Sequence, residues 1–300
     1  MTVLKSHDTI LEKATSGKTR RLAVAAAEDK AVLSAVKTAA EKSVVIPLFV
    51  GNSEKIKEIA ENIGFDISGF EIIHENNPAV SSKKAVQLIR EKKADFLMKG
   101  MVGTADLMKA VLDKENGLRK GSTLSHIAFF ETPAYHKLLA LTDAALNVAP
   151  DVSEKAAIIR NAVDAYHRLG IEKPKVAVAA AVEKVNPKME ATVDAAVLKT
   201  MNSRNQIKGC VVDGPLAVDN IVSKEACEHK GIETEVGGDA DIIVCPDIEA
   251  ANVMYKTMNF LGSATSAAVI MGASVPVVLT SRADTDKSKL MSIALAAAMN

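Results

Sequence analysis

Residues Ala240–Cys245 read Ala-Asp-Ile-Ile-Val-Cys, and Pro246 and Asp247 follow them. A second apolar stretch, Val275–Leu279, reads Val-Pro-Val-Val-Leu, and the residues Thr-Ser-Arg-Ala-Asp follow it at positions 280–284. Unbroken apolar runs of this length are typical of strands in parallel sheets, which helices cover on both faces. In such sheets, ligands bind beyond the carboxyl ends of the strands. The second run therefore delivers a hydroxyl, a guanidinium and a carboxylate to the edge where a binding site is expected.

Strand and helix patterns alternate along nearly the whole chain. Between the strand-like runs lie segments of helical period such as Glu154–Val163, for which Asp151 is a capping residue and Gly170 an end signal. This alternation predicts βαβ units and an α/β fold of mainly parallel sheets with flanking helices. The predicted strands are Leu22–Ala27, Val44–Val50, Phe70–His74, Asp95–Met98, Ser125–Phe130, Lys137–Leu141, Lys175–Val182, Ile207–Val212, Asp241–Cys245, Ala267–Met271 and Val275–Thr280.

The length of the chain and one interruption of the pattern indicate two domains. At 300 residues, 48% of them apolar, the chain exceeds the size that a single hydrophobic core usually serves. The pattern breaks at residues 143–153, and a second crossing near residue 281 would return a last helix, Ser288–Met299, to the first domain. We therefore predict a first domain of residues 1–147 with 282–300 and a second domain of residues 148–281.

Composition disfavours several classes of protein. Basic and acidic residues number 37 each, and aromatic residues make up 3% with no tryptophan, so no surface for nucleic acid is expected. The polar start Met1–Asp8 does not read as a signal peptide, and the longest uncharged stretch, Ala264–Ser281, is interrupted by glycine and proline. The three cysteines form no Cys-x-x-Cys pair. We expect a soluble cytoplasmic protein without a membrane partner and without a zinc site.

The side chains that follow the second apolar run are the first candidates for catalysis. Arg282 carries a planar fork that matches phosphate or carboxylate and stays charged. Ser281 can donate a hydrogen bond to a developing oxyanion, and Asp284 can act as a base. The alternative is structural, because Asp284, Thr285 or Asp286 can cap the final helix. The two interpretations are compatible, since a helix N-terminus is itself an anion site.

A second candidate anion site lies between a predicted strand that ends at Lys99 and a helix that begins at Thr104. Gly100 and Gly103 would let backbone amides approach a phosphate, and the helix dipole favours negative charge. Lys99, and Lys109 further along the helix, would add positive charge. The alternative is an ordinary loop with solvated lysines. For Lys109 taken alone, this structural interpretation and the anion-binding one have equal weight.

Three further positions admit both functional and structural interpretations. Arg119 precedes a buried strand together with several hydroxyl groups. His126 could act as a general acid or base, but a lone histidine entering an apolar run is more often a hydrogen-bonded core residue, which we favour. Asp213 could orient a ligand or only satisfy the amides of a turn. The chain has no Gly-x-Gly-x-x-Gly motif, which disfavours dinucleotide binding.

Several segments together resemble the phosphate acetyl/butyryltransferase family over roughly residues 20–300. Each segment alone is weak evidence for the family, but the segments occur in the same order as in the family, and together they are specific. They are Lys99-Gly100 with Thr104–Leu107, Ser125–Ala128, Thr142–Asp151, Val212–Leu216, Ala240–Ala250 with Asn252, and Thr280–Asp284.

The resemblance implies a two-domain fold like that of isocitrate and isopropylmalate dehydrogenases, with the active site in the cleft between the domains and a homodimer or larger assembly. It implies reversible transfer of an acyl group from a CoA thioester to phosphate, such as butyryl-CoA plus phosphate giving butyryl phosphate plus CoA. Direct attack in a ternary complex is expected, with no tightly bound cofactor and no metal. The expected catalytic residues are Ser281 and Arg282, which match the family's Ser-Arg pair, and Asp284. The expected phosphate- or CoA-binding residues are Lys99, Thr104, Lys109, Arg119, Ser125 and Asn252.

The chain departs from the family at three positions. Lys109 stands where acetyl-transferring relatives have an arginine, which would alter two-pronged capture of phosphate. Ser288 falls near the position of their base aspartate, for which Asp284 or Asp286 would have to substitute. Ala251 stands where a glycine often precedes the residue equivalent to Asn252.

Three other functions are alternatives to butyryl transfer. The first is acetyl transfer from acetyl-CoA to phosphate. The second is a decarboxylating dehydrogenase on the same fold, which would need a divalent metal and a nicotinamide cofactor. The third is a non-catalytic sensor of CoA or phosphate, and nothing in the sequence favours it.

Overall fold

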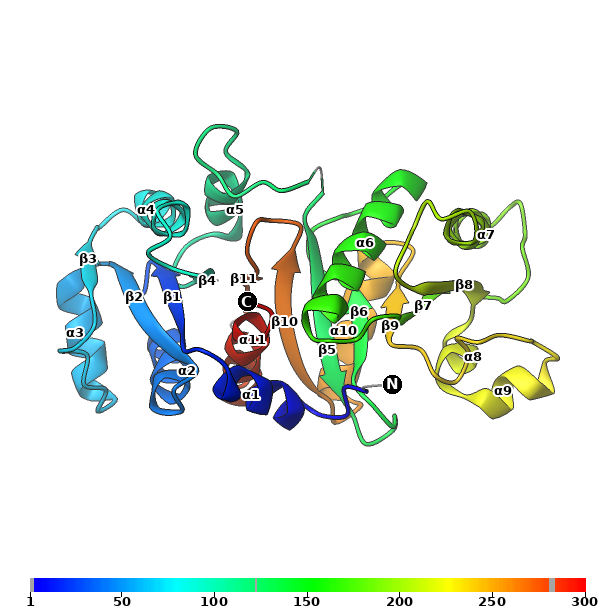
Figure 1. Cartoon of the computed structure of the whole chain (residues 1–300), viewed down its shortest axis with the longest axis horizontal. Coiled ribbons are helices and arrows are strands. Elements are labelled where there is room, and N and C mark those ends of the chain that lie inside the picture. The colour runs from blue at the N-terminus through cyan, green and yellow to red at the C-terminus, as the bar shows by residue number, and fades with distance from the viewer. Residues whose placement is uncertain (1–2, 122, 281–283) are drawn as a thin grey trace. The chain divides into compact units, whose positions relative to one another are not determined.

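The computed structural model describes residues 3–121, 123–280 and 284–300, which form eleven helices and eleven strands (Figure 1). The helices are α1 His7–Ser16, α2 Lys30–Glu41, α3 Ser53–Asn62, α4 Pro78–Arg90, α5 Thr104–Leu112, α6 Val152–Arg168, α7 Glu190–Ser203, α8 Val218–Val222, α9 Lys224–His229, α10 Ile248–Phe260 and α11 Asp286–Ala298. The strands are β1 Arg20–Ala25, β2 Val45–Gly51, β3 Ile72–His74, β4 Phe96–Lys99, β5 Ser125–Glu131, β6 Leu139–Thr142, β7 Lys175–Ala179, β8 Val211–Leu216, β9 Ile242–Val244, β10 Thr265–Met271 and β11 Val277–Val278.

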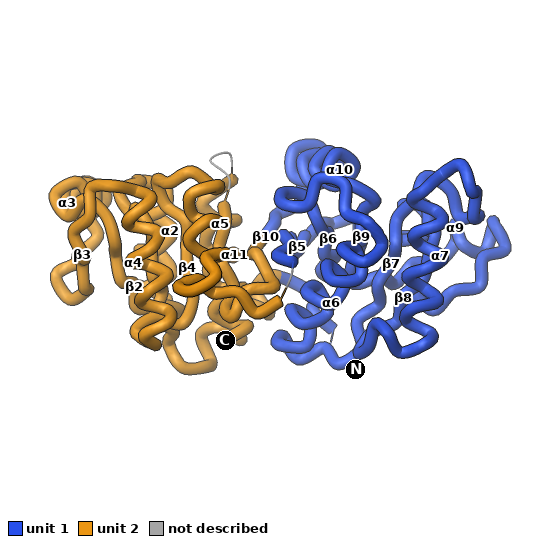
Figure 2. Tube along the Cα trace, turned by 90° about the horizontal axis from the view of Figure 1, so that it is seen from above, with its two compact units in different colours: residues 1–6, 123–266 blue, residues 7–122, 267–300 orange. Residues whose placement is uncertain are grey.

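Packing divides the chain into two compact units, which Figure 2 shows in different colours. Unit 1 comprises residues 1–6 and 123–266, and unit 2 comprises residues 7–122 and 267–300. The sequence placed the two crossings later, after residues 147 and 281. The division falls earlier because β5 pairs with β6, and β6 pairs with β9, so this hairpin packs with the strands of unit 1. The last helix, α11, lies in unit 2, where it packs against α1 and α2.

The strands of unit 2 run in the order β3-β2-β1-β4-β11 and are parallel to one another, whereas β10 pairs antiparallel with β11. Leu22–Ala25 in β1 and Phe96–Met98 in β4 are fully buried. They are buried because α4 and α5 pack together on one face of the strands, and α1, α2 and α11 pack together on the other (Figure 1). Strands covered on both faces can be apolar throughout, which is the pattern that the sequence shows.

The strands of unit 1 run in the order β5-β6-β9-β7-β8, and all the neighbours are parallel except the β5–β6 hairpin. Helix α6 begins with the predicted cap: the Asp151 carboxylate accepts from the Glu154 backbone N–H at 2.8 Å, and the Glu154 carboxylate accepts from the Asp151 N–H at 2.9 Å. The prediction of an α/β fold with mainly parallel strands and flanking helices is therefore confirmed in both units.

Several predicted strands differ from the observed ones at their ends; for example, the strand predicted at 175–182 ends at Ala179 and the one predicted at 70–74 begins at Ile72. Two of the differences have a clear local cause. The strand predicted at 207–212 begins only at Val211, because Gly209 turns the chain with a φ of 75°, and it continues to Leu216 through Pro215. Proline is tolerated there since β8 ends the strand order and pairs with β7. The run predicted at 275–280 forms only the two-residue strand β11, since Pro276 has no N–H to donate to a neighbouring strand.

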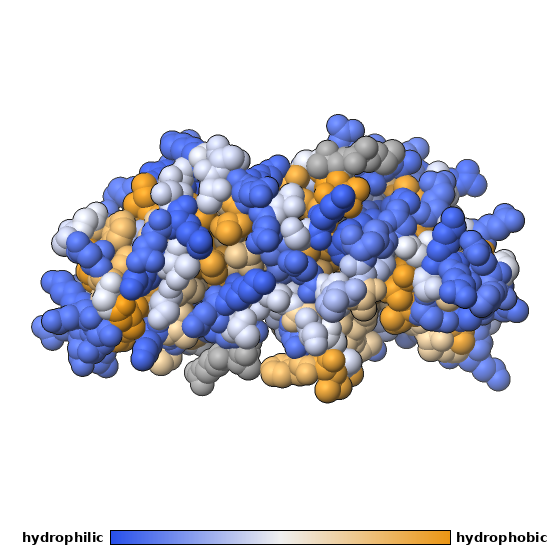
Figure 3. Space-filling view, turned by 90° about the horizontal axis from the view of Figure 1, so that it is seen from below, coloured by the Kyte–Doolittle hydropathy of each residue, from blue (hydrophilic) through white to orange (hydrophobic). Residues whose placement is uncertain are grey.

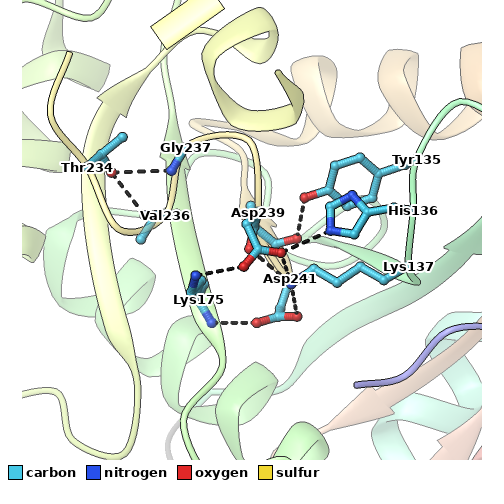
Figure 4. Close-up of polar contacts among 10 residues, drawn as sticks. Tyr135, His136, Lys137, Lys175, Thr234, Val236, Gly237, Asp239 and Asp241 are labelled. Carbon is cyan, nitrogen blue, oxygen red and sulfur yellow. Dashed lines mark hydrogen bonds and ion pairs between the residues drawn. The ribbon is translucent and has the colours of Figure 1, made fainter. Parts of the chain in front are cut away.

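A network of ion pairs joins the starts of three strands in unit 1 (Figure 4). Lys137, which precedes β6, lies 2.9 Å from the Asp239 carboxylate and 2.7 Å from that of Asp241, both of which precede β9. The Nζ of Lys175, the first residue of β7, lies 2.7 Å from Asp239, and His136 lies 3.0 Å from the same carboxylate. These contacts lie at the amino-terminal edge of the strands, so they fix strand positions and are remote from the edge where α/β proteins bind ligands.

This network predicts a specific sensitivity to acid. Burial alone would raise the pKa of Asp239, but hydrogen bonds from Lys175, Lys137 and His136 lower it well below its usual value. Because the folded pKa is below the unfolded one, the stabilisation is complete above about pH 4 and is lost as the pH falls further. We expect Asp239→Asn to be less stable than the wild type near neutral pH and to lose less stability on acidification. Urea unfolding between about pH 7 and about pH 3 measures both effects.

The control for this prediction is Glu58→Gln, at an exposed position, which should unfold as the wild type does at each pH. Equal acid sensitivity of Asp239→Asn and the wild type would contradict the role of the network.

The surface mixes polar and apolar groups. On the face shown in Figure 3, hydrophilic residues predominate and apolar residues are scattered between them.

The cysteines Cys210, Cys227 and Cys245 are buried, and burial raises the pKa of the Cys245 thiol to about 12. Within the described ranges, none of the helices has the length and apolar character needed to span a membrane.

Candidate active site

Lys99 ends β4 at the carboxyl edge of the strands in unit 2. Parallel pairing of β4 with β11 brings Thr280, which follows β11, to the same edge. The chain after Lys99 runs against the end of β1, where the Gly100 N–H donates to Ala25 at 2.8 Å and the Met101 N–H donates to Ala26 at 2.6 Å. Glycine is required at position 100, because a Cβ there would lie 2.1 Å from the Ala26 carbonyl oxygen. Close packing of backbone on backbone therefore positions Lys99.

A cavity of about 220 Å³ lies at this edge. The Lys99 ammonium donates to the carbonyls of Gly100 at 3.2 Å and Val102 at 3.0 Å, so it lies over the loop that it begins. The carboxylate of Asp29 is used as the cap of α2 and accepts from the Val32 N–H at 3.0 Å. Two ammonium groups and one capping carboxylate make the lining suitable for an anion. The cavity is lined by Asp29, Ala31, Val32, Lys99, Gly100, Met101, Val102, Thr280 and Lys289.

Thr104 begins α5, as predicted, and Gly103 occupies the N-cap position. Thr104 and Lys109 are both exposed. Lys109 lies 3.9 Å from Asp106, and its side chain is 81% exposed. It lines a larger groove of about 850 Å³ between α4 and α5, together with residues such as Arg90. Lys109 therefore faces a different hollow of unit 2 from the one that Lys99 lines.

The final helix is capped by Thr285, whose hydroxyl accepts from the Ser288 N–H at 3.1 Å. Of the three predicted capping residues, Thr285 thus has this role. Asp284 is half-buried, and its backbone carbonyl accepts from the Lys289 ammonium. Arg119 is exposed, and its backbone pairs with Ala273 in an isolated bridge. The predicted catalytic residues Ser281 and Arg282 lie outside the described residues.

Ser125 and Asn252 lie at the carboxyl edge of the strands in unit 1. Because β5 runs antiparallel to β6, its first residue, Ser125, lies level with the loop 143–147 that follows β6. The Ser125 hydroxyl accepts from the side-chain amide of Asn161 in α6 at 3.0 Å. The side-chain amide of Asn252 in α10 donates to the Ala144 carbonyl at 3.1 Å. The structure therefore brings these two predicted binding residues to one edge, around one loop.

The loop 143–147 contains polar groups that the sequence analysis did not single out. Asp143 is buried, and its carboxylate accepts from two backbone N–H groups of the loop, at 2.9 and 3.0 Å, and from the side chain of Asn147. Asn147 also donates to the Leu124 carbonyl at 2.8 Å, next to the start of β5. The motif Thr142–Asp151 was used for family resemblance and as a boundary. An Asp and an Asn four positions apart, directly after a buried strand, were the signal for this role.

The structure gives the surroundings of His126 and Asp213, for which the sequence allowed both a functional and a structural role. His126 is buried, and its ring lies edge-on to Tyr255 with a centroid separation of 6.0 Å, which agrees with the favoured core interpretation. Asp213 lies 2.6 Å from Lys199 and accepts from the Gly214 N–H. Among the residues with a described placement, no group of three or more His, Cys, Asp or Glu residues is arranged to hold a metal ion.

Comparison with known proteins gives the family. The chain matches a family model described as phosphate acetyl/butaryl transferase over residues 6–83 and 79–297. The chain belongs to this family. It is 48% identical over 295 residues to the phosphate butyryltransferase of Clostridium acetobutylicum, covering 98% of each chain. It is 46% identical over 281 residues to the phosphate acetyltransferase of Thermotoga maritima, covering 94% of this chain and 95% of that one. A crystal structure of a branched-chain phosphotransacylase from Enterococcus faecalis aligns with a TM-score of 0.81 and 32% identity, covering 94% of this chain and 99% of that one. The resemblance inferred from the motifs is confirmed.

Proposed function

We propose that this member of the phosphate acetyl/butaryl transferase family is a phosphate butyryltransferase, which transfers a butyryl group reversibly between CoA and inorganic phosphate. The observation that carries the proposal is 48% identity to a phosphate butyryltransferase over 98% of each chain. Acetyl transfer is the second candidate, because a phosphate acetyltransferase is 46% identical. The family match favours acyl transfer over the dehydrogenase and over the non-catalytic sensor.

In the proposed reaction, an oxygen of phosphate attacks the carbonyl carbon of the thioester within a ternary complex. The new C–O bond forms, the C–S bond breaks, and its electron pair leaves on the CoA sulfur, which takes up a proton. This chemistry needs cations for the phosphate, a hydrogen-bond donor for the oxyanion and a group that moves the proton. We assign the phosphate to Arg282, Lys99 and Arg119, the oxyanion to Ser281 and the proton to Asp284.

Thr104, Lys109, Ser125 and Asn252 complete the proposed binding residues for CoA and phosphate. Two observations at the carboxyl edges of the strands support these assignments. In unit 2, Lys99 lines a cavity suited to an anion, and in unit 1, Ser125 and Asn252 lie around the loop 143–147. The proposal includes a dehydrogenase-like two-domain arrangement with the site in the interdomain cleft, and a homodimer or larger assembly. CoA enters as a substrate and not as a tightly bound cofactor.

The test is release of free thiol from butyryl-CoA by the purified protein. We expect release to depend on inorganic phosphate and to be matched by formation of butyryl phosphate. Among acetyl-, propionyl-, butyryl- and hexanoyl-CoA at equal concentration, kcat/KM should be highest for butyryl-CoA. The expected preference is modest, since one methylene changes discrimination by about 1–3 kcal/mol. Absence of phosphate-dependent thiol release with every thioester would contradict the proposal, and reduction of a nicotinamide cofactor by a hydroxy-diacid with magnesium would favour the dehydrogenase.

A further inference from the structure

Helix α10 buries little of its surface in the core of unit 1. Only Ala251 of its thirteen residues is buried, whereas α6 buries eight of its seventeen. The two helices lie on opposite faces of the strands of unit 1 (Figure 2). Helices in folded proteins owe most of their stability to the packing of one face. Helix α10 therefore gains far less from packing within its own chain than α6 does.

The most exposed apolar side chains of the protein gather at this helix. Among the described residues, the four most exposed large apolar side chains are Val148 at 62%, Val253 at 65%, Phe260 at 68% and Leu261 at 83%. Val253 and Phe260 lie in α10, and Leu261 is its C-cap. The Val148 carbonyl accepts from the Ile248 N–H at the start of the helix. Single exposed apolar residues are common, but a gathering of them marks an interaction surface.

The outer side of α10 presents one continuous stripe of exposed residues. At 3.6 residues per turn, the four positions of this stripe lie within about 60° of one another around the helix axis. They are Glu249, Val253, Lys256 and Phe260. The buried residue Ala251 lies on the opposite side of the helix. The α10 stripe therefore points away from the strands and combines two apolar groups with two opposite charges.

The charges of the α10 stripe match a second copy of the same stripe. If two such helices pack antiparallel about a two-fold axis near Val253, Glu249 of each copy lies level with Lys256 of the other, and two ion pairs form. The two Val253 side chains then meet near the axis. Phe260 lies level with the start of the other helix, where Val148 is exposed. With 37 basic and 37 acidic residues, the chain has no net charge that would repel the second copy.

We propose that the α10 stripe, together with Leu261 and Val148, is the surface by which two copies of this chain associate, with the two α10 helices antiparallel. An assembly of copies is part of the proposed function, and the inference goes beyond it by assigning the surface and the register. A second copy is favoured over an unrelated partner because one stripe supplies both members of each ion pair. Asn252 of α10 donates to the Ala144 carbonyl, so the contact would also hold the helix that supports the loop 143–147.

The experiment measures the molar mass of the full chain by sedimentation velocity over a range of concentrations. The wild type should form a dimer of 31.7 kDa chains. Glu249→Lys and Lys256→Glu should each raise the Kd of the dimer at least about tenfold, because two attractive pairs become repulsive at once. The double variant restores opposite charges across the axis and should recover most of the wild-type affinity. Lys188→Glu, which reverses an exposed charge elsewhere in unit 1, is the control and should leave the Kd unchanged.

Three results would overturn the assignment: a wild type that stays a monomer at every concentration, single reversals that leave the Kd unchanged, and a double variant that binds no better than the single ones. Circular dichroism shows whether each variant keeps the wild-type fold. Should a charge reversal prevent folding, Phe260→Ser tests the apolar part of the stripe, and an unchanged Kd there would also overturn the proposal.

Thiol release from butyryl-CoA is measured on the same samples, so that the two proposals can fail separately. Phosphate-dependent release by a protein that stays a monomer would refute the α10 contact and leave acyl transfer standing. Absence of release together with the expected series of Kd values would refute the proposed function and leave the α10 contact standing.

Discussion

Ser281→Ala is expected to lower kcat for butyryl transfer to phosphate by about a hundredfold, because one oxyanion donor is worth roughly 3 kcal/mol of barrier. The KM for butyryl-CoA should change little, since the proposed hydrogen bond would form to the charge that develops in the transition state and not to the ground-state carbonyl. Thiol release under saturating phosphate measures kcat directly. Circular dichroism of the variant shows whether it retains the wild-type fold.

The matched control for this prediction is Ser274→Ala, at an exposed serine in the turn before β11, which should keep full turnover. Arg282→Ala tests the neighbouring assignment, because removal of its guanidinium should weaken the dependence on phosphate as well as turnover. Turnover within a fewfold of wild type in Ser281→Ala would show that another group stabilises the oxyanion. Normal turnover and normal phosphate dependence in Arg282→Ala would remove the central assignment of the proposed mechanism.

The fold could be predicted from sequence because its signals are local. Buried runs such as Leu22–Ala27 and the cap at Asp151 depend on periodicity and on residues a few positions apart, and both are found in the structure. The parallel alternation also predicts that strand ends meet at one edge, and in the structure Lys99 and Thr280 follow paired strands at that edge. Register along an edge strand is less local, and β8 continued through Pro215 where the sequence suggested a turn.

The parts of the candidate site that could not be predicted depend on tertiary contacts. Lys289 reads as an ordinary polar position of a helix, and its burial arises because α11 packs against α1 and α2. Asp143 and Asn147 are four residues apart, but Asn147 also donates to the Leu124 carbonyl, and the loop that contains both residues accepts from Asn252 of α10 through the Ala144 carbonyl. The crossing between the units likewise follows from pairing of β6 with β9, about a hundred residues apart, as parallel strands require long connections.

Asp194→Ala is expected to lower the free energy of unfolding of unit 1 by about 3–5 kcal/mol, the usual effect of leaving a buried charge without its partner. The Nζ of Lys155 in α6 lies 2.6 Å from the carboxylate of Asp194 in α7, and the two side chains are 6% and 9% exposed. Removing the carboxylate leaves an ammonium group buried in the first turn of a helix, where the dipole adds to the penalty. Urea unfolding measures the change.

A double-mutant cycle separates the charge effect from simple loss of packing. Lys155→Met should be destabilising as well, whereas Lys155→Met combined with Asp194→Leu should recover most of the stability, since an apolar pair can replace a buried ion pair. The exposed pair Lys93–Glu91, at 2.9 Å with side chains 60% and 39% exposed, gives the control: Lys93→Met should lower the free energy of unfolding far less than Asp194→Ala does, because solvent screens an exposed ion pair. If Asp194→Ala cost no more than this control, a buried lysine in a first helical turn would be tolerated without an anion.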